Sequence, residues 1–136
     1  MQQALIVATL FVASLASAQP LNLKLGAWET THKGAAFPRP MVDKECITKA
    51  DLQQLAGRPD KDDDDACKLV RPATVSANKW SADRQCSDGR RVHAEFVADS
   101  PERISGSIVS TAAKGGPAMR IEVAGRWLGA SCAGIK

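Results

Sequence analysis

The sequence predicts a mainly β fold: an antiparallel meander that forms a curved sheet or small barrel, with one short α-helix and two disulfides. From Lys68 onward, polar and apolar residues alternate in short segments that are separated by turn-forming clusters such as Ser87–Arg90 and Lys114–Pro117. The four cysteines form an even set. Bulky aromatic residues are few and small residues are common, and small inward-facing residues let a sheet curl.

The beginning of the chain predicts export. Residues 4–15 form an uncharged apolar run, and Ala16, Ser17 and Ala18 follow as small residues that suit a signal peptidase. The run is shorter than the roughly 20 residues that a membrane-spanning helix needs. We therefore expect 1–18 to be a signal peptide, cleaved near Ala18–Gln19. Residues 19–136 would then be a single disulfide-linked, β-rich domain that is periplasmic or secreted, with no membrane span.

Two strands are expected in the first part of this domain. Within 21–33, the side chains of Trp28, Thr30 and His32 share one face of an extended segment. A second short strand is expected over 41–46, after a segment that two prolines interrupt.

A helix is expected over 48–56. Thr48 is a good N-cap residue, and Asp51 stands at the third helical position, where a carboxylate favours the positive end of the helix. Ile47 and Leu52 are spaced so that they can contact each other across the first turn. The apolar face of this helix is narrow, so we expect it to cover one end or one face of a larger element.

The alternating segments predict four further strands, over 80–86, 92–98, 104–108 and 119–127. If Phe96 lies opposite Gly106 across the turn after the second of these strands, Ala98 lies opposite Ile104. Ala94 then lies opposite Ile108 on the same face, with the Phe96 ring over the glycine.

The cysteines are expected to form two disulfides, because export takes the chain to an oxidising compartment. These residues are Cys46, Cys67, Cys86 and Cys132. Four cysteines allow three connectivities, and the sequence does not decide among them. We favour Cys46 with Cys67, which would close a helix and a loop, and Cys86 with Cys132, which would join a middle strand to the last one. A zinc site is the alternative, but no two cysteines have the short spacing of zinc ligands.

Charge and motifs exclude several classes of function. The formal net charge is only +3, both signs are mixed along the chain, and no basic stripe with interleaved aromatic residues indicates nucleic-acid binding. The acidic loop Asp60–Asp65 has part of the spacing of a calcium loop, but it lacks the glycine and the closing glutamate, and whether it binds a cation stays open. No catalytic constellation and no cofactor-binding motif is present, and His32 and His93 are interpreted as ordinary strand residues.

Tryptophan motifs stand at both ends of the expected sheet. Trp28 opens the first strand, and Arg126 and Trp127 lie in the last. In a closed or nearly closed sheet these ends lie side by side, and Arg126 would stack on the Trp28 ring. Two separate core tryptophans are the alternative, which the sequence leaves open. With Trp80, these residues form a candidate structural or binding face.

These motifs carry two resemblances. Gly26-Ala27-Trp28-Glu29-Thr30, the ordered cysteines and the closing segment 125–132 (GRWLGASC) resemble the Gram-negative periplasmic domain-of-unknown-function family 3617 over nearly the whole mature chain. That resemblance implies an exported small domain of uncharacterised role, without catalytic residues to transfer. Gly26, Trp28 and Arg126 also resemble the lipocalin-type pattern, in which an arginine near the last strand packs on a tryptophan of the first.

We therefore expect a non-enzymatic periplasmic binding or interaction module, whose partner is a protein, an envelope component or a small apolar ligand. A lipocalin-like binder of apolar small molecules is one specific form of this expectation. An alternative of a different class is an inhibitor of a periplasmic or extracellular hydrolase, with an exposed loop such as Phe37–Pro40 or the acidic loop entering the target. An internal void of about 300 Å³ or more beside the tryptophans would favour a small-molecule ligand.

Overall fold

A computed structural model describes residues 21–55 and 66–135 of the chain. The expected signal peptide and the acidic loop Asp60–Asp65 lie outside these residues. Within them, one antiparallel sheet has the strand order β2-β1-β8-β7-β6-β5-β3, and β4 also pairs with β5. The strands are β1 (Gly26–Gly34), β2 (Met41–Ile47), β3 (Cys67–Leu69), β4 (Thr74–Val75), β5 (Lys79–Cys86), β6 (Arg91–Ser100), β7 (Arg103–Thr111) and β8 (Met119–Gly129).

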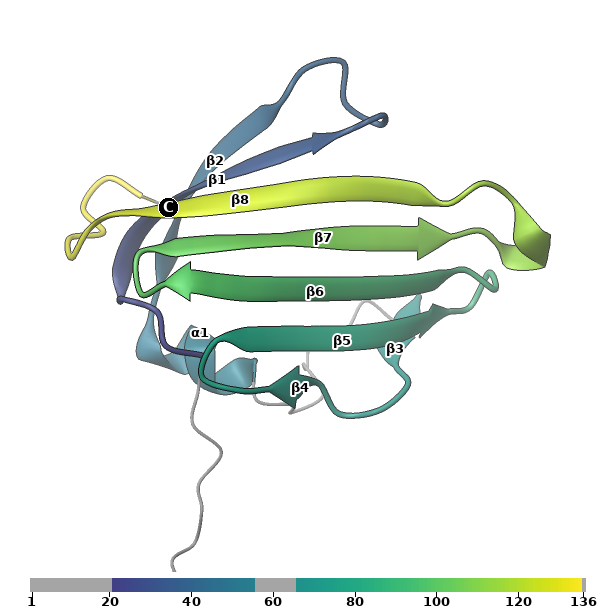
Figure 1. The fold of residues 1–136 in the computed structure, drawn as a ribbon, viewed down its shortest axis with the longest axis horizontal. Helices are drawn as coiled ribbons and strands as arrows, with labels where there is room; N and C mark the ends of the chain where they lie inside the picture. Colours follow the sequence, from purple (N-terminus) through teal and green to yellow (C-terminus); the bar gives the residue numbers. More distant parts are fainter. Residues whose placement is uncertain (1–20, 56–65, 136) are drawn as a thin grey trace, which may run out of the picture.

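The antiparallel meander is confirmed, whereas the small barrel is wrong. The sheet begins at β2 and ends at β3, and these two strands do not pair with each other. Figure 1 shows the long strands β5 to β8 side by side, with the β1–β2 hairpin turning away from them beyond β8. Both edges of the described sheet therefore remain, and of the two forms that the sequence left open the curved sheet is the one present. The short strands β3 and β4 were not expected, because two or three residues show no alternation that a sequence pattern can reveal.

The first and last long strands are neighbours, as the two tryptophan motifs predicted. Trp28 on β1 lies opposite Trp127 on β8. The expected register of the β6–β7 hairpin is also confirmed, with Phe96 opposite Gly106 and Ala98 opposite Ile104. A Cβ atom at Gly106 would lie 2.6 Å from Cδ1 of Phe96, so the ring occupies the space that the missing side chain leaves.

The helix forms where its capping residues predicted it, but it is shorter. α1 spans Lys49–Gln54, with Thr48 as N-cap and Leu55 as C-cap. Thr48 and Asp51 form a capping box: the Asp51 N–H donates to the Thr48 hydroxyl, and the Asp51 carboxylate accepts from the Thr48 N–H at 2.7 Å. The expected last residue of the helix, at position 56, lies outside the described residues.

The hydrophobic core lies at one end of the sheet, where α1 and the segment before β1 meet it. Its buried members are Leu21, Leu23, Trp28 and Leu52, with Ile47 among the partly buried residues packed against them. The 21–25 segment is held by backbone hydrogen bonds to the carbonyl oxygens of Ala77 and Pro101. The core is thin, as the scarcity of bulky side chains predicted, and it covers only part of the inner face of the sheet.

Two disulfides are present, as expected, but the favoured connectivity is wrong. Cys67 on β3 and Cys86 on β5 are register partners and are bonded to each other. Cys46 is bonded to Cys132, with their Cα atoms 5.6 Å apart. The reason is the strand order: Ala27 on β1 pairs with Cys46 on one side and with Gly129 of β8 on the other, so the chain that follows β8 returns to β2. Strands β6 and β7 separate Cys86 from β8.

In residues 21–55 and 66–135, no helix is long and apolar enough to cross a membrane. The single α-helix described has six residues.

Candidate functional site

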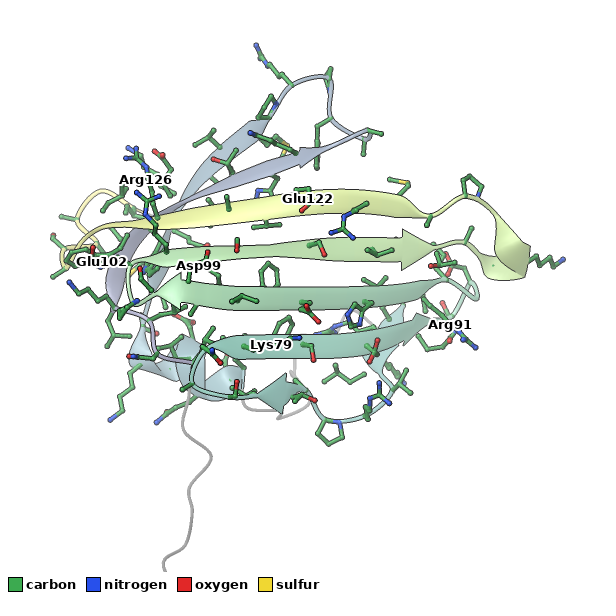
Figure 2. All side chains as sticks on the ribbon, in the orientation of Figure 1. Lys79, Arg91, Asp99, Glu102, Glu122 and Arg126 are labelled. Atoms are coloured by element: carbon green, nitrogen blue, oxygen red, sulfur yellow. A yellow bond between two sulfur atoms is a disulfide. The ribbon has the colours of Figure 1, made fainter. Side chains whose placement is uncertain are left out.

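The two faces of the sheet differ in chemistry. The outer face carries ion pairs between neighbouring strands, such as Arg126 with Glu29 at 2.9 Å and Lys79 with Glu95 at 3.2 Å. Figure 2 labels Lys79 on β5, Glu122 on β8 and Arg126 near the end of β8. A hollow of about 570 Å³ on this face has Lys33, Glu95, Arg120 and Glu122 among its lining. Charged side chains paired across neighbouring strands are typical of a sheet face that is exposed to solvent.

The inner face forms a groove with α1, which we call the tryptophan groove. It has a volume of about 420 Å³, within the usual range of about 300–1,000 Å³ for small-molecule sites. Its lining comes from β1, β2, the α1 region, β5, β6, β7, β8 and the segment before β1: Leu21, Leu23, Trp28, Thr30, His32, Glu45, Cys46, Ile47, Asp51, Leu52, Leu55, Trp80, Phe96, Ile104 and Val123.

Aromatic rings supply the apolar walls of the tryptophan groove. Trp28 is fully buried, and its indole N–H donates to the Lys24 carbonyl oxygen at 2.9 Å. Trp80 donates in the same way to the Leu55 carbonyl oxygen at 3.0 Å, which ties β5 to the end of α1. The Trp80 and Phe96 rings lie 5.5 Å apart, centroid to centroid. Because backbone oxygens satisfy both indole N–H groups, the rings line the groove as apolar surfaces.

One stretch of the tryptophan groove is polar. Thr30 and His32 follow Trp28 at alternate positions of β1 and therefore share its face. Thr30 is buried, and the Nδ1 atom of His32 is buried without a hydrogen-bond partner. A carboxylate oxygen of Asp43 lies 3.8 Å from that nitrogen, which is too far for a hydrogen bond.

Two carboxylates also line the tryptophan groove. Glu45 lies on β2, opposite Trp28 in the register of β1 and β2. Asp51 lies in the first turn of α1, where hydrogen bonds from the side chain and backbone of Thr48 lower the pKa of its carboxyl below the usual value. Asp51 is therefore ionised at neutral pH.

The residues singled out from the sequence divide between the groove and the surface. Trp28 and Trp80 line the tryptophan groove, and Trp127 packs at the edge of the core with the Lys24 ammonium 4.5 Å from its ring centroid. Arg126 does not stack on Trp28. Successive residues of a strand point to opposite faces, so Arg126 lies on the outer face, where it bonds Glu29, while the Trp28 ring is on the inner face. The lysine over Trp127 was not expected.

Several residues of the tryptophan groove were not identified from the sequence. Leu21 and Leu23 lie before the first strand, where no periodic pattern marks them as core residues. The alternation of β1 did place His32 on the face of Trp28 and Thr30, but His32 was interpreted as an ordinary residue at the end of the strand, whereas β1 continues to Gly34 and His32 lines the groove.

The cysteines of the described part of the chain lie in disulfides, and titratable groups such as Asp83 and His93 lie in pairs on the outer face. All four cysteines are in disulfides, and no cluster of three or more His, Cys, Asp or Glu residues in 21–55 and 66–135 is placed to hold a metal ion. On the outer face, the Asp83 carboxylate contacts His93 Nδ1 at 2.7 Å, which lowers the pKa of Asp83. The other ring nitrogen of His93 faces Glu95 at 3.9 Å, not a hydroxyl or thiol nucleophile.

The family model described as "Protein of unknown function (DUF3617)" matches residues 20–132. The chain belongs to this family. The match includes both tryptophan motifs and all four cysteines, so the DUF3617 model extends over every strand of the sheet and α1. No curated protein and no solved structure matches the chain.

Proposed function

We propose that this DUF3617 protein is an exported, non-enzymatic binding module that holds a small, mainly apolar molecule in the tryptophan groove. The observation that carries the proposal is the groove of about 420 Å³ beside Trp28 and Trp80. Its volume lies within the usual range for small-molecule sites, and, unlike the larger hollow on the outer face, it is lined mainly by apolar and aromatic side chains.

The position of the groove supports the proposal. The core covers one end of the inner face, and the groove continues from that core across β1, β8, β7 and β6. A bound apolar molecule would extend the core over side chains that are otherwise partly exposed, including Phe96 and Ile104. Burial of apolar surface is worth about 25 cal/mol per Å², so even a small ligand gains useful affinity there.

Export is the second part of the proposal. It is supported by the apolar run at 4–15 with small residues at 16–18, and by the two disulfides, which form and persist in oxidising compartments. Fractionation of cells that express the full chain tests it: we expect the mature form, cleaved near Ala18, outside the cytosol. Recovery of full-length, reduced protein from the cytosol would refute this part.

The binding test uses N-phenyl-1-naphthylamine, an uncharged apolar dye whose emission rises in apolar surroundings. We expect saturable binding to the wild-type domain and energy transfer from the groove tryptophans to the dye. Val123→Phe adds volume inside the groove and should weaken binding about tenfold or more. Val109→Phe is the matched control, because Val109 lies opposite His93 on the outer face of the neighbouring strand.

Wild-type protein that binds no dye would refute the proposal, and so would equal weakening in both valine variants. Circular dichroism and urea unfolding establish that each variant is folded. If Val123→Phe does not fold, Ile104→Phe, which also adds volume to the groove lining, takes its place. Dye binding that a folded groove variant leaves unchanged would refute the groove as the site.

The alternative role as a hydrolase inhibitor gains no specific support in the described residues. The Phe37–Pro40 segment joins β1 to β2, with Phe37 half-buried and its N–H bonded to the Gly34 carbonyl oxygen. The acidic loop lies outside the described residues.

A further inference from the structure

The polar stretch of the tryptophan groove narrows the chemistry of its ligand. An apolar molecule that fills the groove beside Trp28 and Trp80 would reach Thr30 and His32, which continue along the same face of β1. A ligand without a polar group would leave these side chains covered and unpaired. Covering an unpaired polar group costs about 1–3 kcal/mol, so a ligand with a polar end fits this stretch better.

His32 supplies the point of contact for that polar end. Its Nδ1 atom is buried and unpartnered, although the side chain as a whole is 27% exposed. No accessible surface remains on Nδ1, so a ligand in the groove meets this ring at its exposed part, where the other ring nitrogen, Nε2, is the atom left to bond it. A hydroxyl or an amine on the ligand can donate to this nitrogen when the imidazole is neutral.

The charges around the groove select the sign of that end. Glu45 and Asp51 line it, and Asp43 stands next to His32. No lysine or arginine belongs to the described lining of the groove. A carboxylate or phosphate end would therefore meet like charges without a cationic partner, whereas a cationic end would be attracted.

We propose that the ligand of the tryptophan groove is an amphiphile whose polar end is neutral or cationic and donates a hydrogen bond, placed at Thr30, His32 and Glu45. This inference rests on the proposed function and adds a selection against anionic amphiphiles such as fatty acids. It assigns to Glu45 the charge selection and to His32 the hydrogen bond.

Competition against N-phenyl-1-naphthylamine at neutral pH tests the charge selection with three ligands of equal chain length: octan-1-ol, octylamine and octanoate. We expect octanol and octylamine to displace the dye at concentrations at least about tenfold lower than octanoate. Glu45→Gln should reduce the preference for octylamine over octanoate and leave octanol unchanged. Glu122→Gln, on the outer face beside Arg120, is the matched control and should change nothing.

His32→Phe tests the hydrogen bond, because it keeps a ring of similar size and removes the nitrogen. Octanol competition should weaken about fivefold, the loss expected for one hydrogen bond of ordinary strength. His93→Phe on the outer face is the control. An unchanged octanol affinity in folded His32→Phe would refute the role of His32.

The results separate the two proposals. Dye that fails to bind the wild type refutes the proposed function. Dye that binds and is displaced by octanoate as readily as by octylamine overturns the inference alone, and leaves an apolar site without charge selection.

Discussion

Removing the two disulfides one at a time should have unequal effects on stability, because they close loops of different length. Cys46 and Cys132 are separated by 86 residues, and Cys67 and Cys86 by 19. Loop-closure entropy in the unfolded chain then gives about 4.6 kcal/mol for the longer loop and about 3.2 kcal/mol for the shorter one at 25 °C. The double variant Cys46→Ala/Cys132→Ala should therefore be less stable than Cys67→Ala/Cys86→Ala by about 1.4 kcal/mol.

Urea unfolding, followed by tryptophan emission, measures both free energies by linear extrapolation. Each pair is removed together, so that no free thiol can form a new disulfide. If the variant without the 67–86 bond were the less stable of the two, the loop-length reasoning would be refuted. Equal free energies of unfolding for the two variants would refute the loop-length reasoning as well.

Three further predictions concern single residues. Gly106→Ala should destabilise the domain by about 3 kcal/mol or more, because a Cβ there would lie 2.1 Å from a backbone oxygen of β6. Gly129→Ala is the control, because a Cβ at Gly129 meets nothing within 4 Å. The midpoints of thermal unfolding of these two variants should therefore be widely separated. Thr48→Ala should cost about 1 kcal/mol in urea unfolding, since it removes the N-cap of α1, and an unchanged midpoint would argue against the capping box. The hydrogen bond from His93 lowers the pKa of Asp83 below its ordinary value of 3.8, so its stabilisation is present above that pH and is lost as pH falls. Asp83→Asn should therefore lose less stability on acidification, by at most about 1 kcal/mol for this exposed pair, and parallel curves would contradict it.

The parts of the fold that the sequence predicted depend on neighbours in the chain. The register of the β6–β7 hairpin follows from alternation on both sides of one turn, and the start of α1 follows from Thr48 and Asp51. The disulfide connectivity failed because it depends on which strands become neighbours. The pairing of β1 with β8, which brings Cys132 to Cys46, is a contact between strands far apart in the sequence. The tryptophan motifs suggested it, but they did not place β2 on the far side of β1.

The candidate site was predictable in part for the same reason. Trp28 and Trp80 stood out by residue type, and both line the groove. Leu21 and Leu23 did not, because the tertiary fold, and not a local pattern, decides what covers them. Strand alternation placed His32 on the face of Trp28, but it did not show that this face lines a groove. Arg126 was expected to stack on Trp28, but it pairs with Glu29. The pattern within β8 alone does not show which residue of β1 lies opposite Arg126.

The place of β1 within the sheet sets the order in which a growing chain can complete it. β1 pairs with β2 as soon as the first hairpin exists, but its other edge must wait for β8, the last strand to be synthesised. Contacts between segments so far apart in sequence form slowly. A nascent or truncated chain that lacks β8 would present β1 as a bare edge, ready to pair with another molecule. Incomplete products of this protein should therefore aggregate and not persist as partly built sheets.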